Sequence, residues 1–336
     1  MGKLSGKKIL VTGGTGSIGS EIVERALAED AAVVRVLDND ECALFALRKQ
    51  SSDDGRLRYL LGNVRNRDRL SMAMEDIDVV FHTAALKHVE LNEYNPFETI
   101  QTNVLGTQNL VRVALEEEVE SFVTISTDKA SNPVSVMGAT KLLSERLVVA
   151  ANTYKGSRDT RFGCVRFGNV IGTSGSVVPT FMNQISKGGP VTVTDPDMTR
   201  FVLPIDDAVD LVFTAHQRMT SGEVFVLKME TLRIGDLAEA MIEHFASDFG
   251  YRPEEIDVEI IGGRPGERLH EKLISVEESL HVRELDRFYV ILPQLDIPGY
   301  DPVSYEGIAE VNGEYTSTSQ DPLTHSEIAR MVEQSL

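Results

Sequence analysis

The chain has 336 residues, of which 25% are charged and 42% hydrophobic, and its formal net charge at pH 7 is −19. This length and balance are typical of a folded globular protein with one large domain or two smaller ones. The negative charge argues against nucleic acid or an acidic membrane surface as a partner, because the overall field repels phosphate groups. No apolar run reaches the roughly 18 residues that span a bilayer, and no signal peptide precedes the first predicted strand, so we expect a cytoplasmic protein.

Cysteine and histidine give no sign of a metal site. Cys42 and Cys164 cannot form a disulfide framework and lack the spacing of metal ligands. His82, His88 and His270 are scattered along the chain without a paired ligand. We therefore expect no structural metal.

Strands and helices alternate along the first half of the chain. Each predicted strand is short and apolar and is followed by a segment with helical periodicity. The predicted strands are "KKILVT", "AVVRVLD", "RLRYLLG", "DVVFHTAA" and "SFVTIST", and the helices include "ECALFALRKQ", "RDRLSMAME" and segments near 96–117 and 133–155. This alternation predicts a parallel sheet with helices on both faces. Right-handed crossovers make it a doubly wound, Rossmann-type α/β sheet that binds a dinucleotide.

The regular alternation fades after residue 170, where Gly and Pro interrupt the segments. We expect residues 1–170 to form the nucleotide-binding domain, to which some later segments return. Residues 171–290 are expected to form a smaller substrate-binding lobe that closes over the strand ends, and residues 291–336 an irregular tail.

A glycine-rich turn joins the first strand to the first helix. In "TGGTGSIG" the glycines have G-x-x-G-x-x-G spacing. Glycine lets the backbone turn tightly and approach a pyrophosphate, whose charge then faces the N-terminus of the helix. The cofactor-binding residues expected in this turn are Gly13, Thr15, Gly16, Ser17, Ile18 and Gly19.

Asp38 closes the second strand, at the place where a ribose-binding carboxylate belongs. A carboxylate there accepts hydrogen bonds from the ribose hydroxyls and repels a 2′-phosphate. Asn39 follows, with no Arg or Lys to bind such a phosphate. The charge pattern therefore favours NAD over NADP. The alternative is that Asp38 only caps the next helix.

The loops after the third and fourth strands supply further candidates. Asn63 and Val64 are expected to touch the adenine. Ala84, Ala85 and Lys87 are expected to lie along the cofactor and reach toward the substrate, because the carboxyl ends of parallel strands carry the site. The alternative for Lys87 is a solvated surface lysine.

Motifs along most of the chain resemble those of extended short-chain dehydrogenases/reductases. Within that superfamily they are similar to the 4,6-dehydratases of UDP-N-acetylglucosamine, of the polysaccharide biosynthesis type, in a variant with an M-x-x-x-K motif. The resemblance runs from about residue 7 to 290, and "STDKA" and "RPGERLHE" are its most specific parts. The motifs in chain order are "TGGTGSIG", "AALKHV", "TNVLGTQN", "STDKA", "GATK", "RFGNV", "TDPDMTRF" and "RPGERLHE".

The resemblance implies a UDP-sugar substrate and a tightly bound NAD. Such a dehydratase oxidises C4 of the sugar, removes the C5 proton that the 4-ketone has acidified, eliminates the C6 hydroxyl as water and finally reduces C6. The site needs a base for the O4 proton, a second base for C5 and a general acid for the C6 hydroxyl. Some relatives also invert C5, and the sequence leaves this stereochemistry open.

Asp128 and Lys129 follow Thr127 at the carboxyl end of a strand. By resemblance, Asp128 protonates the C6 hydroxyl and Lys129 is the base for C5. Burial raises the pKa of a carboxyl group and lowers that of an amine, which suits both roles, whereas pairing between the two opposes both shifts. The alternative is an ordinary ion pair at the strand end.

Lys141 lies one helical turn after Met137, so the two side chains share a face. By resemblance, Lys141 holds the nicotinamide ribose and supplies positive charge near O4. Most relatives have a tyrosine where this chain has Met137, and a thioether cannot take the O4 proton. Either the enzyme is inactive, or the proton leaves through Asp128 or Lys141 with a bridging water.

The remaining candidates are implied by the resemblance. Asn103 is expected at the cofactor, and the arginines at the diphosphate, because guanidinium pairs with phosphate in a bidentate manner. Each arginine has the alternative of a surface ion pair. The substrate-binding candidates are Lys87, Asn169, Val177, Pro179, Arg200, Arg264 and Glu267.

Two other functions stay open. A nucleotide-sugar 4-epimerase needs the redox step but neither an acid for C6 nor a base for C5, so Asp128 and Lys129 argue against it. A non-catalytic NAD-sensing module would bind the cofactor without turnover. By resemblance, the helices near 96–117 and 134–155 pair in a homo-oligomer.

Overall fold

The computed structural model describes residues 4–51, 54–173, 175–300, 305–311 and 313–335. Its main feature is a nine-stranded sheet of order β14-β15-β10-β6-β5-β4-β1-β2-β3. The strands from β3 to β10 run parallel, and β15 pairs antiparallel with β10 and β14. The strands are β1 (Lys8–Thr12), β2 (Val33–Asp38), β3 (Leu57–Leu61), β4 (Val79–His82), β5 (Ser121–Thr127), β6 (Arg161–Phe167), β10 (Val224–Leu227), β14 (Val282–Glu284) and β15 (Phe288–Ile291). The predicted Rossmann-type α/β sheet is confirmed.

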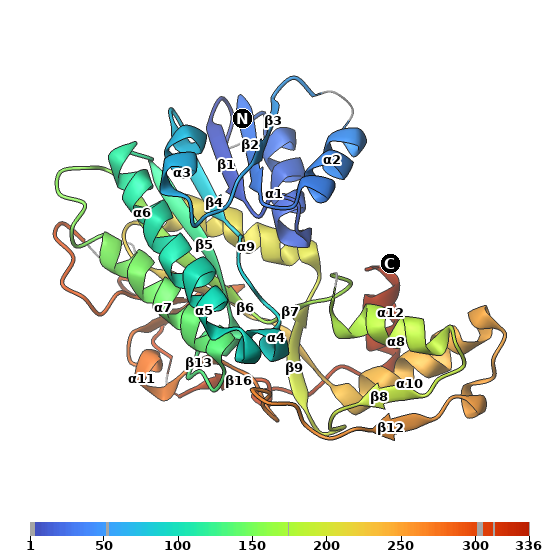
Figure 1. Ribbon diagram of the computed structural model, residues 1–336. Coiled ribbons are helices and arrows are strands. Elements are labelled where there is room, and N and C mark those ends of the chain that lie inside the picture. The colour runs from blue at the N-terminus through green and yellow to red at the C-terminus, as the bar shows by residue number, and fades with distance from the viewer. Residues whose placement is uncertain (1–3, 52–53, 174, 301–304, 312, 336) are drawn as a thin grey trace.

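Helices cover both faces of this sheet (Figure 1). On one face α3, α6 and α7 pack side by side, and on the other face α1 packs against α9. The central strands β1, β4, β5, β6 and β10 are buried between these layers, which is why they are largely apolar. The helices of this domain are α1 (Ser17–Ala28), α2 (Glu41–Gln50), α3 (Arg67–Met74), α4 (Val89–Tyr94), α5 (Pro96–Thr99), α6 (Gly106–Glu116), α7 (Val136–Ala151) and α9 (Ile205–Arg218).

The helix predicted near 96–117 is broken into three parts. A π-helical segment, η1 (Ile100–Leu105), connects α5 to α6. Such segments are uncommon and occur often near functional sites. The helix predicted from residue 133 begins later, at Val136, because the side chain of Ser135 accepts a hydrogen bond from the Gly138 N–H and caps it.

A second hydrophobic core, separate from that of the large sheet, lies in the smaller lobe. Figure 1 shows this lobe beside the carboxyl ends of the large sheet, with α8, α10 and α12 grouped together. It contains a three-stranded sheet of order β11-β9-β7 and a two-stranded sheet of β12 and β8. Its elements are β7 (Asn169–Val170), α8 (Val177–Ile185), β8 (Val191–Val193), β9 (Thr199–Leu203), β11 (Glu230–Arg233), α10 (Ile234–Phe245), η3 (Ala246–Phe249), η4 (Pro253–Glu255) and β12 (Val258–Ile260).

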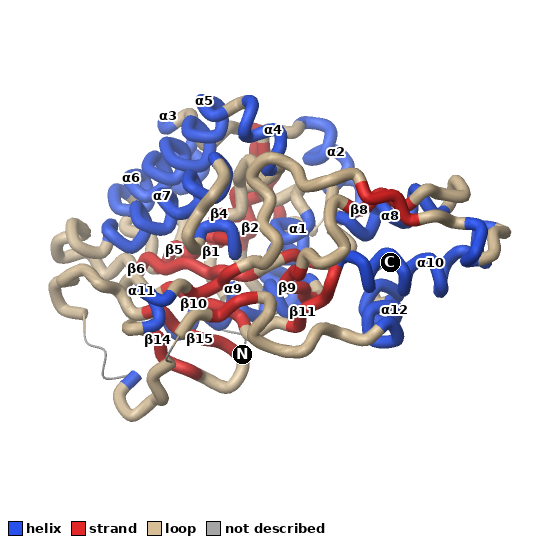
Figure 2. Tube along the Cα trace, turned by 90° about the horizontal axis from the view of Figure 1, so that it is seen from below, coloured by secondary structure: helices blue, strands red, loops and turns tan. Residues whose placement is uncertain are grey.

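The expectation of an irregular tail after residue 291 is wrong for its last part. Residues His325–Glu333 form helix α12, which packs against α10 (Figure 2). Thr324 and Glu327 form a capping box, and Ile328 and Val332, one turn apart, are fully buried in the core of the lobe. The capping box and the helical spacing of the two apolar residues are both local features of the sequence, and together they predict this helix.

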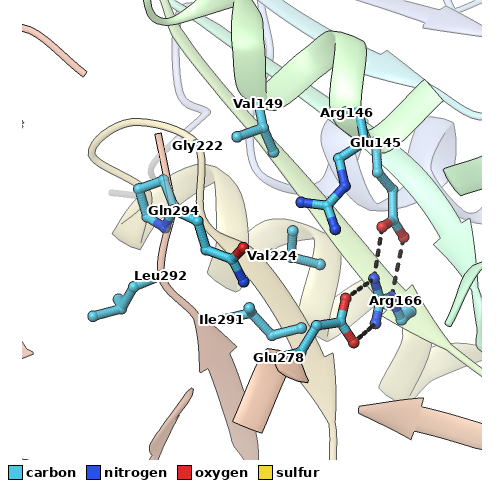
Figure 3. A pocket seen from close by; sticks show the side chains of 11 residues that line it. Glu145, Arg146, Val149, Arg166, Gly222, Val224, Glu278, Ile291, Leu292 and Gln294 are labelled. Carbon is cyan, nitrogen blue, oxygen red and sulfur yellow. Dashed lines mark hydrogen bonds and ion pairs between the residues drawn. The ribbon is translucent and has the colours of Figure 1, made fainter. Parts of the chain in front are cut away.

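Three short elements tie the end of the chain to the large domain. β13 (Lys272–Ile274) pairs with β16 (Tyr315–Thr316), and α11 (Val276–Ser279) follows β13. Arg166 of β6 lies between Glu145 of α7 and Glu278 of α11, with N–O distances of 2.6 Å and 2.9 Å (Figure 3). All three side chains are buried, and removing one partner of such a group typically costs about 3–5 kcal/mol. The triad therefore holds in place the helix that carries Met137 and Lys141.

Candidate active site

A cleft with a volume of about 970 Å³ runs along the carboxyl ends of the central strands toward the smaller lobe. Most of the residues predicted for cofactor and catalysis line it. They are Gly13, Thr15, Gly16, Ser17, Ile18, Gly19, Asp38, Asn39, Asn63, Val64, Ala84, Ala85, Lys87, Thr127, Lys129, Met137, Lys141 and Asn169.

The glycine turn is packed too closely for a side chain at Gly13 or Gly19. Gly13 has φ +68°, and a Cβ atom there would lie 2.7 Å from the backbone of Ala84. A Cβ atom on Gly19 would lie 2.2 Å from the Gly13 carbonyl oxygen. Gly16 is the N-cap of α1 and makes no side-chain cap, so the first-turn N–H groups face the cleft without one. This geometry suits a pyrophosphate.

Asp38 holds the glycine turn and does not cap the following helix. Its Oδ2 accepts hydrogen bonds from the Thr15 N–H at 3.1 Å and from the Thr15 hydroxyl at 2.6 Å. The cap of α2 is Asp40, whose side chain accepts from the Ala43 N–H at 2.9 Å. The helix-cap alternative for Asp38 is therefore wrong. Its carboxylate lies on the cleft wall, where a ribose would lie.

Asn103 lies behind the cleft wall, which differs from its predicted place at the cofactor. It is buried in η1, and its side-chain oxygen accepts from the Leu86 N–H at 2.8 Å. Its amide nitrogen donates to the Leu86 carbonyl and to the Thr140 hydroxyl, at 3.0 Å and 3.1 Å. Asn103 thus joins the loop after β4 to helix α7 and positions both.

His82, which ends β4, belongs to the same buried network. Its Nδ1 lies 2.8 Å from the Thr12 hydroxyl and its Nε2 lies 3.0 Å from the Thr107 hydroxyl. Thr107 donates its own proton to the Asn103 carbonyl, so it can only accept from Nε2–H. Burial, with a smaller contribution from Lys141, lowers the pKa of His82 to about 3, so this imidazole is neutral at neutral pH.

The predicted acid and base form a buried ion pair. The Lys129 Nζ donates to Asp128 Oδ1 at 2.9 Å, and Thr127 donates to the same oxygen at 2.7 Å. Asp128 is 1% exposed and lies just behind the cleft lining, whereas Lys129 reaches into the cleft. The other oxygen of Asp128, Oδ2, is buried without a hydrogen-bond partner among the described residues.

Glu271 is a third charged residue beside the Asp128–Lys129 pair, and it was not among the predicted site residues. Its Oε1 lies 3.4 Å from the Lys129 Nζ and 3.8 Å from the Arg200 Nε. Burial by itself lowers the pKa of Lys129, but the charges of Asp128 and Glu271 outweigh it and the pKa is raised. The sequence left open whether burial or pairing prevails for this lysine, and pairing does. Glu271 closes the "RPGERLHE" motif, which was the available signal.

Met137 and Lys141 lie on one face of α7 and both line the cleft. The Lys141 Nζ donates to the Ile125 carbonyl at 2.5 Å. Burial lowers the pKa of Lys141 to about 8, although Glu145 and Cys164 oppose the shift. Met137 lies one turn before this amine and Glu145 one turn after it, and of the two titratable groups only Lys141 lines the cleft.

Ser126 was not singled out as a site residue, although "STDKA" contains it. It lines the cleft at the end of β5 and is buried, and its hydroxyl makes no hydrogen bond to the residues described. A buried polar atom facing a cleft without a partner is a common feature of ligand sites. The signal was its place beside Thr127 at a strand end.

Of the predicted substrate residues, Asn169 on β7 and Lys87 line the cleft, and five others lie outside it. Val177 and Pro179 form the first turn of α8, next to the cleft residue Ser176. Arg200 donates to the Thr199 carbonyl at 2.8 Å and to the Leu269 carbonyl at 3.3 Å. Arg264 is half exposed and lies 3.8 Å from Glu90, and Glu267 accepts from the Arg264 N–H at 3.1 Å.

Arg264 and Glu267 belong to a loop, residues 262–271, that we term the strap. Gly266 in the strap lies so close to Val89 and Ser135 that a Cβ atom would come within 2.9–3.0 Å of their side chains. Arg268 donates to the Asn132 carbonyl. The strap therefore runs from α4 across the start of α7 to Lys129.

No group of three or more His, Cys, Asp or Glu side chains within the described ranges is arranged to hold a metal ion. Both cysteines are free thiols. In the part of the chain that the structure describes, none of the helices combines the length and apolar character needed to cross a membrane.

Comparison with known proteins agrees with this architecture. A family model described as "Polysaccharide biosynthesis protein" matches residues 9–293. The UDP-N-acetylglucosamine 4,6-dehydratase (inverting) of Campylobacter jejuni is 41% identical over 292 residues, covering 86% of this chain and 84% of the relative. An uncharacterized membrane protein, MJ1061, of Methanocaldococcus jannaschii is 56% identical over 287 residues, covering 85% and 86%. A UDP-glucose 4-epimerase of Rickettsia canadensis is 37% identical, covering 85% and 82%.

Two solved structures show the same fold. The X-ray structure of Pen from Bacillus thuringiensis has a TM-score of 0.92 at 39% identity and covers 98% of both chains. DesIV, a dTDP-glucose 4,6-dehydratase from Streptomyces venezuelae solved with NAD and TYD, has a TM-score of 0.70 at 25% identity, covering 78% of this chain and 86% of that one.

Proposed function

The chain belongs to the polysaccharide biosynthesis protein family, with the extended short-chain dehydrogenase/reductase fold that its motifs predicted, and we propose that it is an NAD-dependent UDP-N-acetylglucosamine 4,6-dehydratase. The product is a UDP-4-keto-6-deoxy-N-acetylhexosamine for surface glycan or glycoprotein synthesis. The observation that carries the proposal is the Asp128–Lys129 pair, whose amine reaches into the cleft lined by the glycine turn. The C. jejuni relative has this activity in its name.

The cleft fits NAD. A Cβ atom on Gly13 or Gly19 would collide with the backbone of Ala84 or of Gly13 itself, so the turn keeps its tight shape only with glycine at these positions, and Asp38 ends the next strand as a ribose partner. When bound, NAD would take a hydride from C4 of the sugar and return it to C6. The Asp38 carboxylate favours NAD over NADP, because it repels a 2′-phosphate. DesIV, with the same fold, was solved with NAD.

The Asp128–Lys129 pair can supply both an acid and a base. If the proton in the 2.9 Å hydrogen bond moves from Nζ to Oδ1, the result is a neutral amine and a neutral carboxylic acid. The amine then takes the C5 proton, and the acid protonates the C6 hydroxyl, which leaves as water. The ammonium of Lys129 returns its proton to C5 when C6 is reduced. The proton released earlier from O4 restores the Asp128 acid, so protons balance over one turnover.

The O4 proton needs an acceptor other than Met137. Lys141, with its pKa near 8, is partly neutral at mildly alkaline pH and lies on the same helix face. We propose that a water passes the proton either to Lys141, which later returns it to Asp128, or directly to Asp128, in which case Lys129 loses its own proton to solvent and not to Asp128. If Asp128→Asn retains full C4 oxidation, measured as reduced cofactor formed with substrate, the route through Asp128 fails.

The substrate side supports a nucleotide diphosphate. Asn169 on β7 lines the cleft, and Arg264 is exposed enough to turn from Glu90 toward a diphosphate. Arg200 is proposed as a second diphosphate partner, with Glu267 at the uridine ribose. The roles of Arg264 and Glu267, which belong to the strap and lie outside the cleft lining, require the strap to move toward the cleft.

A 4-epimerase is the second candidate, since a relative named UDP-glucose 4-epimerase is 37% identical. Epimerisation needs neither an acid at C6 nor a base at C5, so it leaves Asp128 and Lys129 without a role. An NAD-sensing module leaves them without a role as well. The C. jejuni relative is named as an inverting enzyme, so the C5 configuration of the product is part of the test below.

We also propose a cytoplasmic homo-oligomer. Large apolar side chains are exposed on α4, α5, η1 and α7, which an isolated chain would leave in water. A second copy packed on this surface would bury them. These side chains are Leu91, Tyr94, Phe97, Ile100, Leu105 and Leu143.

One experiment separates the three functions. The protein is incubated with UDP-N-acetylglucosamine in deuterated water, and the sugar is followed by mass and proton NMR. Loss of one water with deuterium at C5 supports the dehydratase, and coupling constants at C5 report inversion. A C4 epimer of unchanged mass supports the epimerase, and absence of reaction supports the sensor.

A further inference from the structure

Glu271 has the features of a functional carboxylate. It lies directly before β13 and is 3% exposed. Its Oε2 is buried without a hydrogen-bond partner among the described residues. A buried carboxylate oxygen without a hydrogen-bond partner destabilises the folded state, because no contact offsets the free energy of removing the charge from water. Its presence therefore indicates a role in function and not in stability.

The contacts of Glu271 separate its backbone from its side chain. The backbone N–H donates to the Ser317 hydroxyl at 2.9 Å, and this bond attaches the end of the strap to β16. The side chain has two ionic contacts, at 3.4 Å to Lys129 and 3.8 Å to Arg200. The fold therefore uses the backbone of Glu271, while the carboxylate faces the proposed base.

The charges around Lys129 come from each element packed on it. Asp128 precedes it in the short 3-10 helix η2 (Asp128–Ala130), Glu271 approaches from the strap and Arg200 from β9. Helix α7 also packs on η2, but its Lys141 donates to a carbonyl and its Glu145 is taken by Arg166. The ammonium of Lys129 thus lies between two carboxylates, and the farther one is shared with a guanidinium.

Building on the dehydratase function proposed above, we propose that Glu271 is a positioning residue: it holds the Lys129 ammonium beside Asp128 in the resting enzyme and, together with Arg200, sets how readily that ammonium releases its proton. With Glu271 charged, the amine stays protonated until the substrate has been bound and oxidised at C4. Deprotonation of Lys129 before C4 is oxidised is thereby suppressed. Arg200 weakens this hold, since it draws on the same carboxylate oxygen.

The first test measures the protonation of Lys129 without turnover. The full-length protein is acylated briefly with acetic anhydride over a range of pH, and the modification of Lys129 is read by peptide mass spectrometry against Lys141 in the same sample. In Glu271→Gln, we expect the reactivity of Lys129 at neutral pH to rise roughly tenfold, because one of two neighbouring negative charges is lost. Glu271→Asp retains the charge and should stay within about threefold of the unmodified protein.

The matched control is Glu314→Gln, which removes the exposed partner of Lys272, the residue next to Glu271. It should leave the labelling of Lys129 unchanged. An unchanged Lys129 profile in a folded Glu271→Gln protein overturns the proposal, and so does an equal rise in Glu314→Gln. Thermal melting shows which samples are folded. If Glu271→Gln does not fold, the test uses Glu271→Asp, which keeps the charge. A pH profile of Lys129 labelling in Glu271→Asp that differs from that of the wild-type protein then contradicts the charge argument.

The second test uses the reaction. With UDP-N-acetylglucosamine in deuterated water, the pH profile of deuterium entry at C5 should move to lower pH in Glu271→Gln, while reduced cofactor formed at C4 is unchanged. A purely structural role would lower both signals together, and that result contradicts the proposal. If the unmodified protein neither oxidises C4 nor exchanges C5, the dehydratase function has failed, whereas the labelling experiment still decides whether Glu271 controls Lys129.

Discussion

The cofactor side of the cleft is built from short contiguous segments, whereas its substrate side is built from segments that lie far apart in the chain. On the cofactor side, one strand, one turn and one helix bring Gly13, Gly16 and Gly19 together, and Asp38 ties down the turn. On the substrate side, the strap crosses from α4 to η2, and its Arg264 lies near the Glu90 carboxylate while its Arg268 donates to the Asn132 carbonyl. Apart from Asn103, the residues predicted for the first side line the cleft, whereas most of those predicted for the second side lie outside its lining.

The largest expected effect concerns the acid and base, which lie where the two sides meet. Asp128→Asn and Lys129→Met should each lower the dehydration rate by about 10²–10⁴-fold, because each removes a proton-transfer group. The amount of bound NAD should be unchanged, since neither residue belongs to the glycine turn. Turnover and cofactor content are measured on the same samples. Lys187→Met, an exposed lysine of the smaller lobe, is the control and should keep full activity. A dehydration rate within threefold of normal in either variant contradicts the assignment.

The next effect tests whether the cofactor side is rigid. Gly13→Ala introduces a Cβ atom 2.7 Å from the Ala84 backbone, and this overpacking should cost about 1–3 kcal/mol, or up to roughly a hundredfold in NAD affinity. Gly6→Ala is a matched control: its φ is +75°, close to that of Gly13, but no atom lies within 4 Å of the added Cβ. Fluorescence titration with NAD gives both affinities. Equal affinities would show that the close approach at Gly13 is unimportant.

A smaller effect is expected on the substrate side. Arg264→Ala should raise KM for the UDP-sugar about tenfold with little change in kcat, because a diphosphate contact contributes equally to ground state and transition state. The control is Arg233→Ala, which breaks an exposed ion pair with Asp197 in the smaller lobe and should leave KM unchanged. Unchanged KM in Arg264→Ala would mean that its pairing with Glu90 is only a surface ion pair.

The smallest effect concerns stability and belongs to the cofactor side. Burial lowers the pKa of His82 to about 3, whereas in the unfolded chain it lies near 6.5. Between these values the unfolded chain binds a proton that the folded chain excludes, so stability is lost as the pH falls below about 6.5. His82→Gln should reduce the loss between pH 6.5 and 5.5 by about 1 kcal/mol, measured by urea unfolding. The exposed His244→Gln is the control, and a steeper loss in His82→Gln would refute the assignment.

Prediction from the sequence was most successful where a residue and its partners are neighbours in the chain. The alternation of strands and helices and the glycine turn depend on local pattern, and the structure agrees with both. Helix α12 was not predicted, although its capping box at Thr324 and Glu327 is a local signal that the sequence contains. Asn103 was placed at the cofactor, but its bonds to Leu86 and Thr140 lie behind the wall. Those partners come from other elements, and no local pattern identifies them.

The sequence by itself determined the class of fold, the glycine turn and the presence of an acid and a base beside each other, because these follow from periodicity, backbone freedom and adjacency in the chain. The tertiary structure alone decided the charge of Lys129. Its environment combines burial, the adjacent Asp128 and the distant Glu271, which reaches it only after the strap folds across α7. A pKa depends on all charges within a few ångströms, and those distances exist only in the folded chain.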